Sequence, residues 1–245
     1  MRHPLVVGGA SGIGLSLVMA LCERQDVERV YVVDRQMFPA EYASLKVQGR
    51  ICDLSTSDLS FLGQMTDVDA LFITAGFGHL GMAQDFDDAY IERIMTVNAT
   101  APIRIIRHFY GRLMTDASFP CAVMVSIAGR LASPMFAYYS ASKAAVRMFV
   151  EAANVELEVQ ASANRILEVS PGSLRGTSFN GGVSDPSLTT ALAHEIIARA
   201  EAHESLFIPQ YDEVFRGVLQ RYHDDPHKFA VDSYWYKKNG RQHKS

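Results

Sequence analysis

The chain has 245 residues, of which 48% are apolar and 20% are charged, and its net charge is −4 at pH 7. This composition is that of an ordinary globular protein, and the length is sufficient for one α/β domain with a full core. A negative net charge provides no basic surface for nucleic acid, so no nucleic-acid partner is expected.

The remaining composition gives no sign of a metal site or of secretion. Three cysteines are scattered, odd in number and without metal-ligand spacing, which is typical of a reducing compartment. Pro226 interrupts the helix that His223 and His227 would need to share a metal ion, so no metal site is predicted. Four glycines break the amino-terminal apolar run, and no other run is long enough to span a bilayer. We therefore expect a cytoplasmic protein without a membrane partner.

The first predicted elements are a strand, a glycine turn and a helix. The strand over 5–7 leads into Gly8, and Gly12 and Gly14 complete the pattern G-x-x-x-G-x-G at the start of an amphipathic helix over 13–23. Glycines allow a tight turn and let backbone amides approach a pyrophosphate at the helix N-terminus. Glycine patterns often mark only a turn, but this one lies between a strand and a helix, which favours dinucleotide binding.

A second strand, over 29–33, ends at Asp34, which lies 20 residues after Gly14. An acidic side chain at this place can accept both ribose hydroxyls of adenosine and repels a 2′-phosphate, so it favours NAD over NADP. Arg35 is the counter-argument, because a guanidinium group can face a phosphate. Ser11 adds no helping cation in the glycine turn. NAD is therefore the predicted cofactor, with NADP as the alternative.

Strands and helices alternate along the rest of the chain. Strands are predicted over 46–51, 70–74, 122–125 and 165–170, and helices over 56–65, 85–114 (interrupted near 98–102) and 137–160. Such alternation predicts an α/β fold, a doubly wound parallel sheet with helices on both faces and ligands at the carboxyl ends of the strands. The residues that fall at such ends, and should share one site, are Asp34, Asp53, Gly76, Ser126 and Pro171.

The chemistry is predicted around one tyrosine. Tyr139 and Lys143 stand four apart on a predicted helix and share one face, and Ser126 ends the strand 13 residues before the tyrosine. An ammonium group beside a phenol favours the phenolate, which would bring a pKa near ~10 toward neutrality and make the phenol a usable acid or base. Two further Tyr-x-x-x-Lys matches begin at Tyr42 and Tyr234 but lack a serine at the same offset. A tyrosine at a helix start is by itself often an ordinary amphipathic residue; the serine and the glycine turn favour catalysis.

These features together resemble the short-chain dehydrogenase/reductase family, in its single-domain branch of about this length. The matching positions lie within roughly residues 4–180 and are Gly8, Gly12, Gly14, Asp53, Ala75, Gly76, Asn98, Ser126, Tyr139, Lys143, Pro171 and Gly172. The resemblance implies a Rossmann-type fold of about seven strands. It also implies hydride transfer between a nicotinamide cofactor and an alcohol or carbonyl.

The resemblance assigns roles to single residues. Tyr139 would be the general acid/base, and Ser126 would orient the substrate oxygen. Lys143 would lower the tyrosine pKa and hold the nicotinamide ribose, and Asn98 would place a water that links the lysine to solvent. Asn98 could also simply cap a helix kink, and Asp53 could cap a helix that begins after it. The residues expected to contact the cofactor are Gly8, Ser11, Gly12, Ile13, Gly14, Asp34, Arg35, Asp53, Leu54, Ala75, Gly76, Asn98, Tyr139, Lys143, Pro171, Gly172, Leu174 and Thr177.

The chain departs from the family pattern at a few positions. Val7 stands where the family usually has threonine, and Thr74 where it usually has asparagine; both positions usually brace the sheet. The family's threonine on the nicotinamide amide normally stands five after the proline, where this chain has Gly176, so the role of Thr177, one residue later, is an extrapolation.

The substrate side is predicted from loops. The walls would be residues 77–80 and 130–136, and residues 173–203 would form a lid whose first part carries Phe179. Arg130 and Arg175 could hold a carboxylate or phosphate, although surface arginines are more often simply solvated. An atypical segment over 204–245 replaces the usual family ending, with a strand over 204–209 and a helix over 211–223.

We therefore expect a single domain over 1–245 that acts as an NAD-dependent oxidoreductase on a small alcohol or carbonyl. The alternative is a non-catalytic NAD(P)-binding redox sensor, which loss of the tyrosine or lysine would have favoured. Surplus small and apolar residues on the helix 137–160 favour a homodimer or homotetramer.

Overall fold

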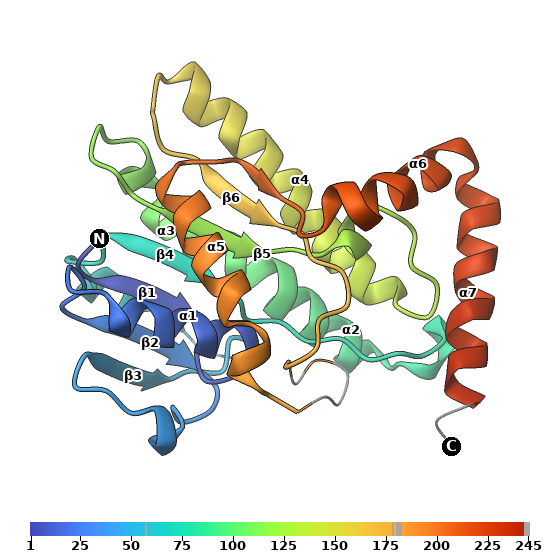
Figure 1. Cartoon of the computed structure of the whole chain (residues 1–245), viewed down its shortest axis with the longest axis horizontal. Coiled ribbons are helices and arrows are strands. Elements are labelled where there is room, and N and C mark those ends of the chain that lie inside the picture. Colours follow the sequence, from blue (N-terminus) through green and yellow to red (C-terminus); the bar gives the residue numbers. More distant parts are fainter. Residues whose placement is uncertain (57, 178, 180–182, 243–245) are drawn as a thin grey trace.

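The structure is a computed structural model that describes residues 1–56, 58–177, 179 and 183–242, with the backbone alone for 240–242. Its centre is one parallel sheet in the order β3-β2-β1-β4-β5-β6-β7 (Figure 1). The strands are β1 Pro4–Val7, β2 Val30–Asp34, β3 Val47–Ile51, β4 Ala70–Ile73, β5 Cys121–Met124, β6 Ile166–Val169 and β7 Leu206–Phe207. Every neighbouring pair is parallel, and the strand order reverses between β1 and β4. The predicted doubly wound α/β fold is therefore confirmed.

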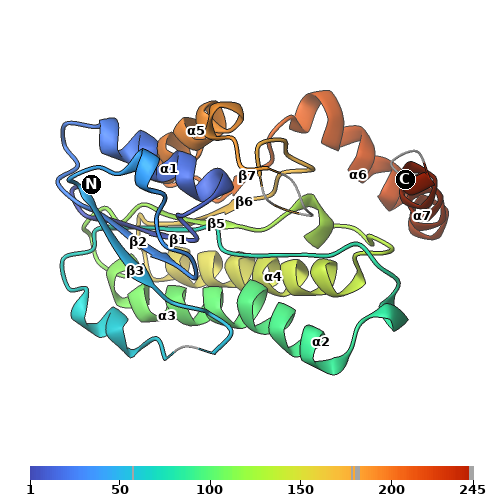
Figure 2. The same ribbon diagram turned by 90° about the horizontal axis from the view of Figure 1, so that it is seen from below.

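Helices cover both faces of the sheet (Figure 2). One face carries α1 Gly12–Glu23 and α5 Thr190–Glu201. The other carries α2 Asp88–Met95, α3 Ala101–Leu113 and α4 Ala137–Val159. Because crossover helices shield both faces, the central strands are apolar on both sides, as in other parallel sheets.

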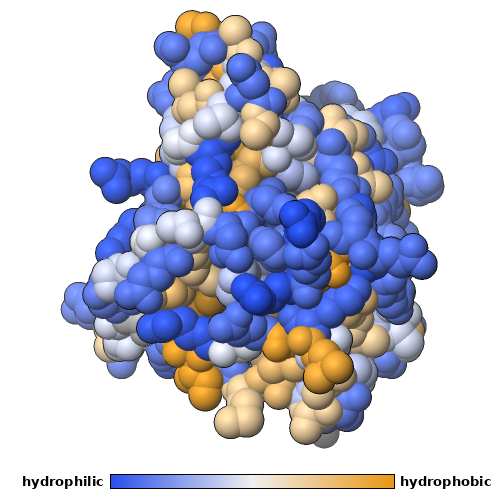
Figure 3. All heavy atoms as spheres, turned by 90° about the vertical axis from the view of Figure 1, so that its left-hand side faces the viewer, coloured by the Kyte–Doolittle hydropathy of each residue, from blue (hydrophilic) through white to orange (hydrophobic). Residues whose placement is uncertain are grey.

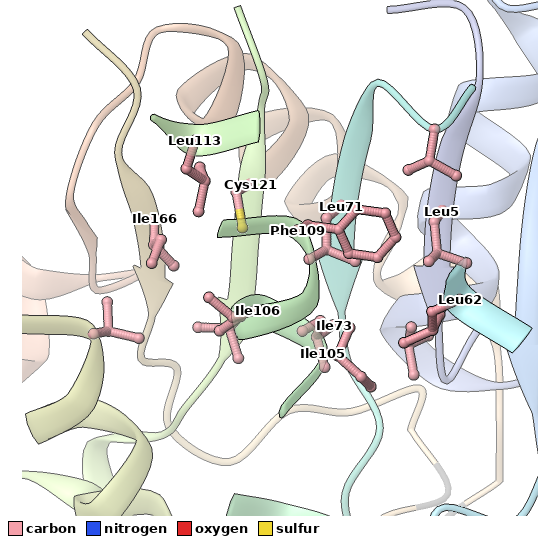
Figure 4. Close-up of a cluster of buried hydrophobic side chains, with 14 of the residues drawn as sticks. Leu5, Leu62, Leu71, Ile73, Ile105, Ile106, Phe109, Leu113, Cys121 and Ile166 are labelled. Atoms are coloured by element: carbon pink, nitrogen blue, oxygen red, sulfur yellow. The ribbon is translucent and has the colours of Figure 1, made fainter. Parts of the chain in front are cut away.

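The core consists of two layers that alternate along each central strand. In β1, Leu5 and Val7 belong to the cluster on the α3–α4 side, whereas Val6 belongs to the cluster on the α1–α5 side. Figure 4 shows the first cluster, in which Ile73 of β4 lies beside Ile105 of α3. Burial of these side chains fixes the strand register, and so fixes where each strand ends.

Two predicted helices take a different form. The helix predicted over 56–65 is reduced to a 3₁₀ turn at Ser60–Gln64, because Asp53 and Ser55 form a side-chain turn ahead of it. The break predicted near 98–102 is a π-helical turn, Thr96–Thr100, through which α2 continues into α3. The helical segment is therefore continuous, but the angular positions of its side chains shift at the π-helical turn.

The predicted lid over 173–203 ends earlier than expected. Its second half contains α5, where Ala193, Ile196 and Ala200 are buried in the core against α1. Residues 190–201 therefore belong to the fold rather than to a lid. Within the first half, positions 178 and 180–182 lie outside the described residues.

The segment 204–245 continues as a helical extension beyond the sheet. The short strand β7 is followed by a π-helical turn Tyr211–Phe215 and by two helices, α6 Arg216–Asp224 and α7 Pro226–Gln242. Both helices stand beyond the carboxyl ends of the strands (Figure 1). No side chain described in α7 is buried, so this helix depends on a small number of specific contacts.

The opposite, amino-terminal end of the sheet is mainly polar. Figure 3 views the molecule from that end and shows apolar side chains chiefly along its lower margin, toward β3. The connection from β2 to β3 contains only the 3₁₀ turn Ala40–Tyr42, so β3 is an exposed edge and Met37, Leu45 and Ile51 face solvent. No ligand-binding constellation is predicted at this end.

Candidate active site

The carboxyl ends of the central strands meet as the sequence predicts. Backbone amides of Thr74 and Ala75 both donate to the Val7 carbonyl, and the Ile127 amide donates to the Pro171 carbonyl at 3.0 Å. The Thr74 hydroxyl donates to the carbonyls of Val7, at 3.1 Å, and Gly8, at 3.0 Å. Thr74 therefore braces the switch point between β1 and β4 although it replaces the usual asparagine.

The glycine turn is packed backbone against backbone. Gly8 has a φ of +89°, and a Cβ there would lie 2.5 Å from the Ala75 nitrogen. A Cβ on Gly14 would lie 2.0 Å from the Gly8 carbonyl oxygen. Only glycine fits these two positions, and the close fit brings the start of α1 up to the sheet edge.

The amino terminus of α1 offers backbone amides to an anion. Ser11 precedes the helix in an extended conformation and its side chain makes no capping bond. The Gly12 amide donates to the Ser184 hydroxyl at 2.8 Å, and Ile13 anchors the helix in the core below. A helix start beside a glycine turn, without a capping bond from Ser11, fits the pyrophosphate of a dinucleotide.

Asp34 lies beside this turn at the end of β2. One of its carboxylate oxygens accepts from the Ala10 amide and the other from the Gln36 amide, each at 3.0 Å. Arg35 follows with an exposed side chain. The acidic residue predicted to select the cofactor is thus held in place by the backbone that it adjoins.

Asp53 and Leu54 follow the end of β3 and make local contacts. The Asp53 carboxylate accepts from the backbone amide and the hydroxyl of Ser55, at 2.9 and 2.7 Å, and these bonds lower its pKa. Leu54 packs against the core cluster of the α3–α4 side. The alternative of a local capping role for Asp53 accounts for its side chain, although it caps a turn and not a helix.

Ser126, Tyr139 and Lys143 come together at the end of β5. Ser126 is buried; its Oγ accepts from the Ala128 amide at 3.1 Å and donates to the Pro171 carbonyl at 3.4 Å, and it lies beside the phenol of Tyr139, whose pKa it lowers. Lys143 lies one turn further along α4, where its Nζ donates to the Met124 carbonyl at 2.8 Å and lies 5.8 Å from the centre of the tyrosine ring. The neighbouring Tyr138 points away, because its hydroxyl donates to the Ala83 carbonyl.

The electrostatics of this pair differ from the expectation based on the ammonium alone. Burial raises the pKa of Tyr139 to about 12, although the hydrogen bond with Ser126 opposes this shift. Burial also lowers the pKa of Lys143 to about 8. The predicted lowering of the tyrosine pKa is therefore not seen, since desolvation of the phenolate outweighs the favourable interaction with Ser126. At neutral pH the phenol carries its proton and Lys143 is mainly charged.

Asn98 is fully buried inside the π-helical turn. Its Oδ1 accepts from the Phe77 amide at 2.9 Å, and its Nδ2 donates to the Phe77 carbonyl at 2.7 Å and to the Ser142 hydroxyl at 3.2 Å. A Cβ on Gly76 would lie 3.3 Å from both Asn98 Oδ1 and Lys143 Nζ. The asparagine thus fixes the backbone after Gly76 beside the lysine, a position that a simple kink cap would not need.

Aromatic side chains wall the substrate side. The ring centres of Tyr139 and Phe136 are 5.8 Å apart, those of Tyr139 and Phe179 are 5.1 Å apart, and those of Phe136 and Phe179 are 6.2 Å apart. A Cβ on Gly78 would lie 2.9 Å from both the Tyr139 and Phe179 rings. Beyond this group, Phe86 and Tyr90 stack at 4.2 Å; sequence analysis missed these two because they lie in a predicted helix with no motif.

The β6 end of the site contains further contacts. Gly172 lies against the Phe215 ring, which a Cβ there would meet at 2.3 Å. The contact of Phe215 with the site was not predicted from the sequence, because only the fold brings this residue next to Gly172. Thr177 lies over Gly12, whose Cβ would be 3.5 Å from it, and Leu174 packs against the core cluster of the α1–α5 side.

Arg130 is paired with a buried carboxylate. Its guanidinium forms a salt bridge with Glu168 at 2.6 Å, and that carboxylate is nearly fully buried and also accepts from the Ser170 hydroxyl. Because a buried carboxylate needs a counter-charge, the arginine serves the interior below the site. Among the described residues, no contact of Arg175 supports the predicted anion site.

No group of metal ligands occurs among the described residues. In the same part of the chain, no helix is both apolar and long enough to cross a membrane.

Comparison with known proteins agrees with this geometry. A family model described as short chain dehydrogenase matches residues 2–187. Uncharacterized oxidoreductase TDA5 of Saccharomyces cerevisiae is 27% identical over 190 residues, which cover 72% of this chain and 56% of that protein. The chain therefore spans little more than half the length of this relative.

Two further comparisons cover more of both chains. Cyclopentanol dehydrogenase of Comamonas sp. is 26% identical over 217 residues, which cover 84% of this chain and 80% of the relative. The crystal structure of a short chain dehydrogenase from Burkholderia cenocepacia, in complex with NADP, has a TM-score of 0.75 at 22% identity, and the match covers 95% of this chain and 99% of that one. At 22% identity this structural similarity supports the fold alone.

Proposed function

Because the chain belongs to the short-chain dehydrogenase family, we propose that it is an oxidoreductase that transfers a hydride between a nicotinamide cofactor and an alcohol or carbonyl substrate. The observation that carries this proposal is the joint placement of Ser126, Tyr139 and Lys143 beside the glycine turn. Three ionisable or hydroxyl groups at one sheet edge, next to a dinucleotide cradle, are what such a reaction requires.

Each side chain has a specific task in this proposal. The phenol of Tyr139 gives its proton to the carbonyl oxygen during reduction, or takes it from the alcohol during oxidation. Ser126 holds the same oxygen by a hydrogen bond, and the charged Lys143 offsets the negative charge that develops there. The nicotinamide supplies or accepts the hydride. Since the phenol is protonated at neutral pH, reduction is the direction for which the site is already prepared, and oxidation should gain speed as pH rises.

The cofactor is held by residues of the first two strand ends. The amides after Gly8 and Gly12 would bind the pyrophosphate, and Asp34 would accept from the adenosine ribose. Asp34 supports NAD, whereas the Burkholderia relative contains NADP and Arg35 is exposed beside the same place. We therefore propose a nicotinamide dinucleotide, with NAD preferred on the charge of Asp34.

The substrate proposed is a small apolar alcohol or ketone. Phe136, Phe179 and Phe215 line the approach to Tyr139 and Gly172, and Arg130 is paired with Glu168. A wall of aromatic rings favours an apolar group over an acid or phosphate.

The test is replacement of Tyr139 by phenylalanine, with Tyr138→Phe as the matched control. Tyr139→Phe should lower turnover of ketones by about 10²-fold or more, because the proton donor is lost while the ring remains. Cofactor affinity should stay unchanged in both variants, and Tyr138→Phe should keep turnover within a few fold. A wild-type protein that binds the cofactor but reduces no ketone and oxidises no alcohol would support a redox sensor instead.

We also propose that the protein assembles as a homodimer or homotetramer through α4. Some of the small and apolar residues that the sequence analysis noted on this helix are buried in the core, among them Val146, Val150 and Ala153. Met148 and Val155, seven residues apart on the outer face of α4, remain exposed, and a second copy would cover them. Light scattering at micromolar concentration should show a multiple of 27.1 kDa, and a monomer would contradict the proposal.

A further inference from the structure

α7 reaches the substrate side of the site through one lysine. Lys237 is half-buried, and its Nζ donates to the Ser133 hydroxyl at 2.6 Å and to the Pro134 carbonyl at 2.8 Å. The adjacent side chains on this helix, Trp235 and Tyr236, are largely exposed. Since α7 has no buried side chain in its described part, these two bonds are a principal connection between α7 and the substrate side of the site.

The segment that Lys237 holds is a strained turn. The Phe136 amide donates to the Ser133 carbonyl at 3.0 Å, and Met135 between them has a φ of +63°. A residue with a side chain adopts this left-handed conformation only where its surroundings hold it. The Gly81 amide holds the turn from one side by donating to the Met135 carbonyl at 2.9 Å. Lys237 holds it from the other.

The same turn carries a wall of the site. Phe136 is its last residue, and its ring lies 5.8 Å from the Tyr139 ring and 6.2 Å from that of Phe179. The Lys237 ammonium also lies 5.5 Å from the centre of the Phe136 ring, within the range of a cation–π contact. One side chain of α7 therefore contacts the backbone of the turn and its aromatic ring together.

The partners of this ammonium are uncharged. Among the described residues Lys237 forms no ion pair; it bonds only to a hydroxyl and a carbonyl. A half-buried ammonium without a carboxylate is not stabilised by an ion pair. Its contribution comes from hydrogen bonds, because Nζ has three donors and two of its acceptors lie on the turn.

We propose that Lys237 is a positioning residue for the reaction proposed above. It fixes the turn 133–136 so that Phe136 stands as a rigid wall beside Tyr139, and α7 thereby selects substrates whose apolar group packs on that ring. The proposal rests on the proposed function for its kinetic part, and on the fold alone for its structural part.

The structural part is tested by hydrogen–deuterium exchange of the free protein. Lys237→Met keeps the length of the side chain and removes its donors, and exchange at the amides of 131–137 should rise by about tenfold. Lys228→Met is the matched control, because Lys228 lies exposed on the same helix in an i,i+4 pair with Asp232. Equal exchange in the two variants would overturn the proposal.

The kinetic part is tested with a series of ketones of increasing apolar size. Lys237→Met should raise KM for the larger ketones by about tenfold and change kcat by less than about threefold, because Tyr139 itself is intact. Cofactor affinity should be unchanged, and Lys237→Arg should restore most of the KM. If kcat and cofactor affinity instead fall by as large a factor as KM rises, the variant has lost stability in general, and a positioning role is overturned.

The outcome separates this inference from the proposed function. If Tyr139→Phe abolishes ketone reduction while Lys237→Met and Lys228→Met behave alike in both measurements, the oxidoreductase proposal stands and the role of Lys237 is refuted. If exchange rises in Lys237→Met but no ketone is reduced by the wild-type protein, the proposed function fails while the anchoring of the turn remains.

Discussion

At the ends of β1 and β2 the candidate cofactor cradle is backbone packed on backbone, whereas at the ends of β5 and β6 the substrate side is walled by aromatic side chains from loops. In the cradle, a Cβ on Gly14 would lie 2.0 Å from the Gly8 carbonyl, which cannot move without displacing the strand. On the substrate side, a Cβ on Gly78 would meet the rings of Tyr139 and Phe179 at 2.9 Å.

The difference explains what each half can tolerate. Backbone atoms packed against each other cannot rearrange as side chains can, so the shape of the cradle is fixed and suits one kind of ligand. Apart from the Phe136 ring, which Lys237 contacts, the rings on loops can change rotamer, so this part of the aromatic side can adapt to different apolar groups. We expect mutations in the cradle to abolish function and mutations on the aromatic side to redirect it.

The largest effect is expected for Gly14→Ala. The new methyl group would overlap a carbonyl of the glycine turn, and the resulting shift should cost about 3 kcal/mol of unfolding free energy. Cofactor binding should also be lost, which titration of the folded fraction would measure. Gly111→Ala is the control, because a Cβ there meets nothing within 4 Å; alanine in the last turn of α3 should stabilise the protein by about 0.5 kcal/mol. Equal stability of the two variants would remove the basis of the comparison.

A smaller effect is expected for Asp34→Ala. Loss of the ribose acceptor should weaken NAD binding by about tenfold, and loss of the charge should relax discrimination against NADP. Asp34→Asn helps to separate the two causes, because it keeps one acceptor oxygen, for the Ala10 amide, and removes the charge together with the acceptor of the Gln36 amide. Dissociation constants for both dinucleotides provide the measurement. A wild-type preference for NADP would show that Arg35 dominates and that the NAD assignment is wrong.

The smallest effect is expected for Ser184→Ala. Its hydroxyl accepts from the Gly12 amide, which is one of the amides proposed for the pyrophosphate, so the substrate-side segment competes for the cradle. Removing the hydroxyl should tighten cofactor binding by about threefold. Ser187→Ala is the control, since that hydroxyl donates to Asp185 in the same segment. Weaker binding in Ser184→Ala would instead mean that the serine helps to hold the cofactor.

The predictable parts of the site are those with local patterns. Glycine spacing, apolar strands and the Tyr-x-x-x-Lys turn each depend on residues close in sequence, and the structure places Ser126, Tyr139 and Lys143 together as expected. The tyrosine pKa was predicted in the wrong direction, because the cost of burial depends on the whole fold. Burial of α5 and the arrival of Phe215 at Gly172 depend on contacts between distant segments, for which the chain carries no local motif.

The π-helical turn Thr96–Thr100 has a consequence for the phase of the helices that it joins. An α-helix rotates by about 100° per residue, so one extra residue in a turn rotates everything before it by that angle relative to everything after it. α2 and α3 therefore do not share one apolar stripe: α2 buries only Ile94, whereas α3 buries Ile105, Ile106 and Phe109. The rotation turns Asn98 inward at the point where the stripe changes direction. The Asn98 amide therefore lies on the buried side of a helical segment whose neighbouring buried side chains are apolar.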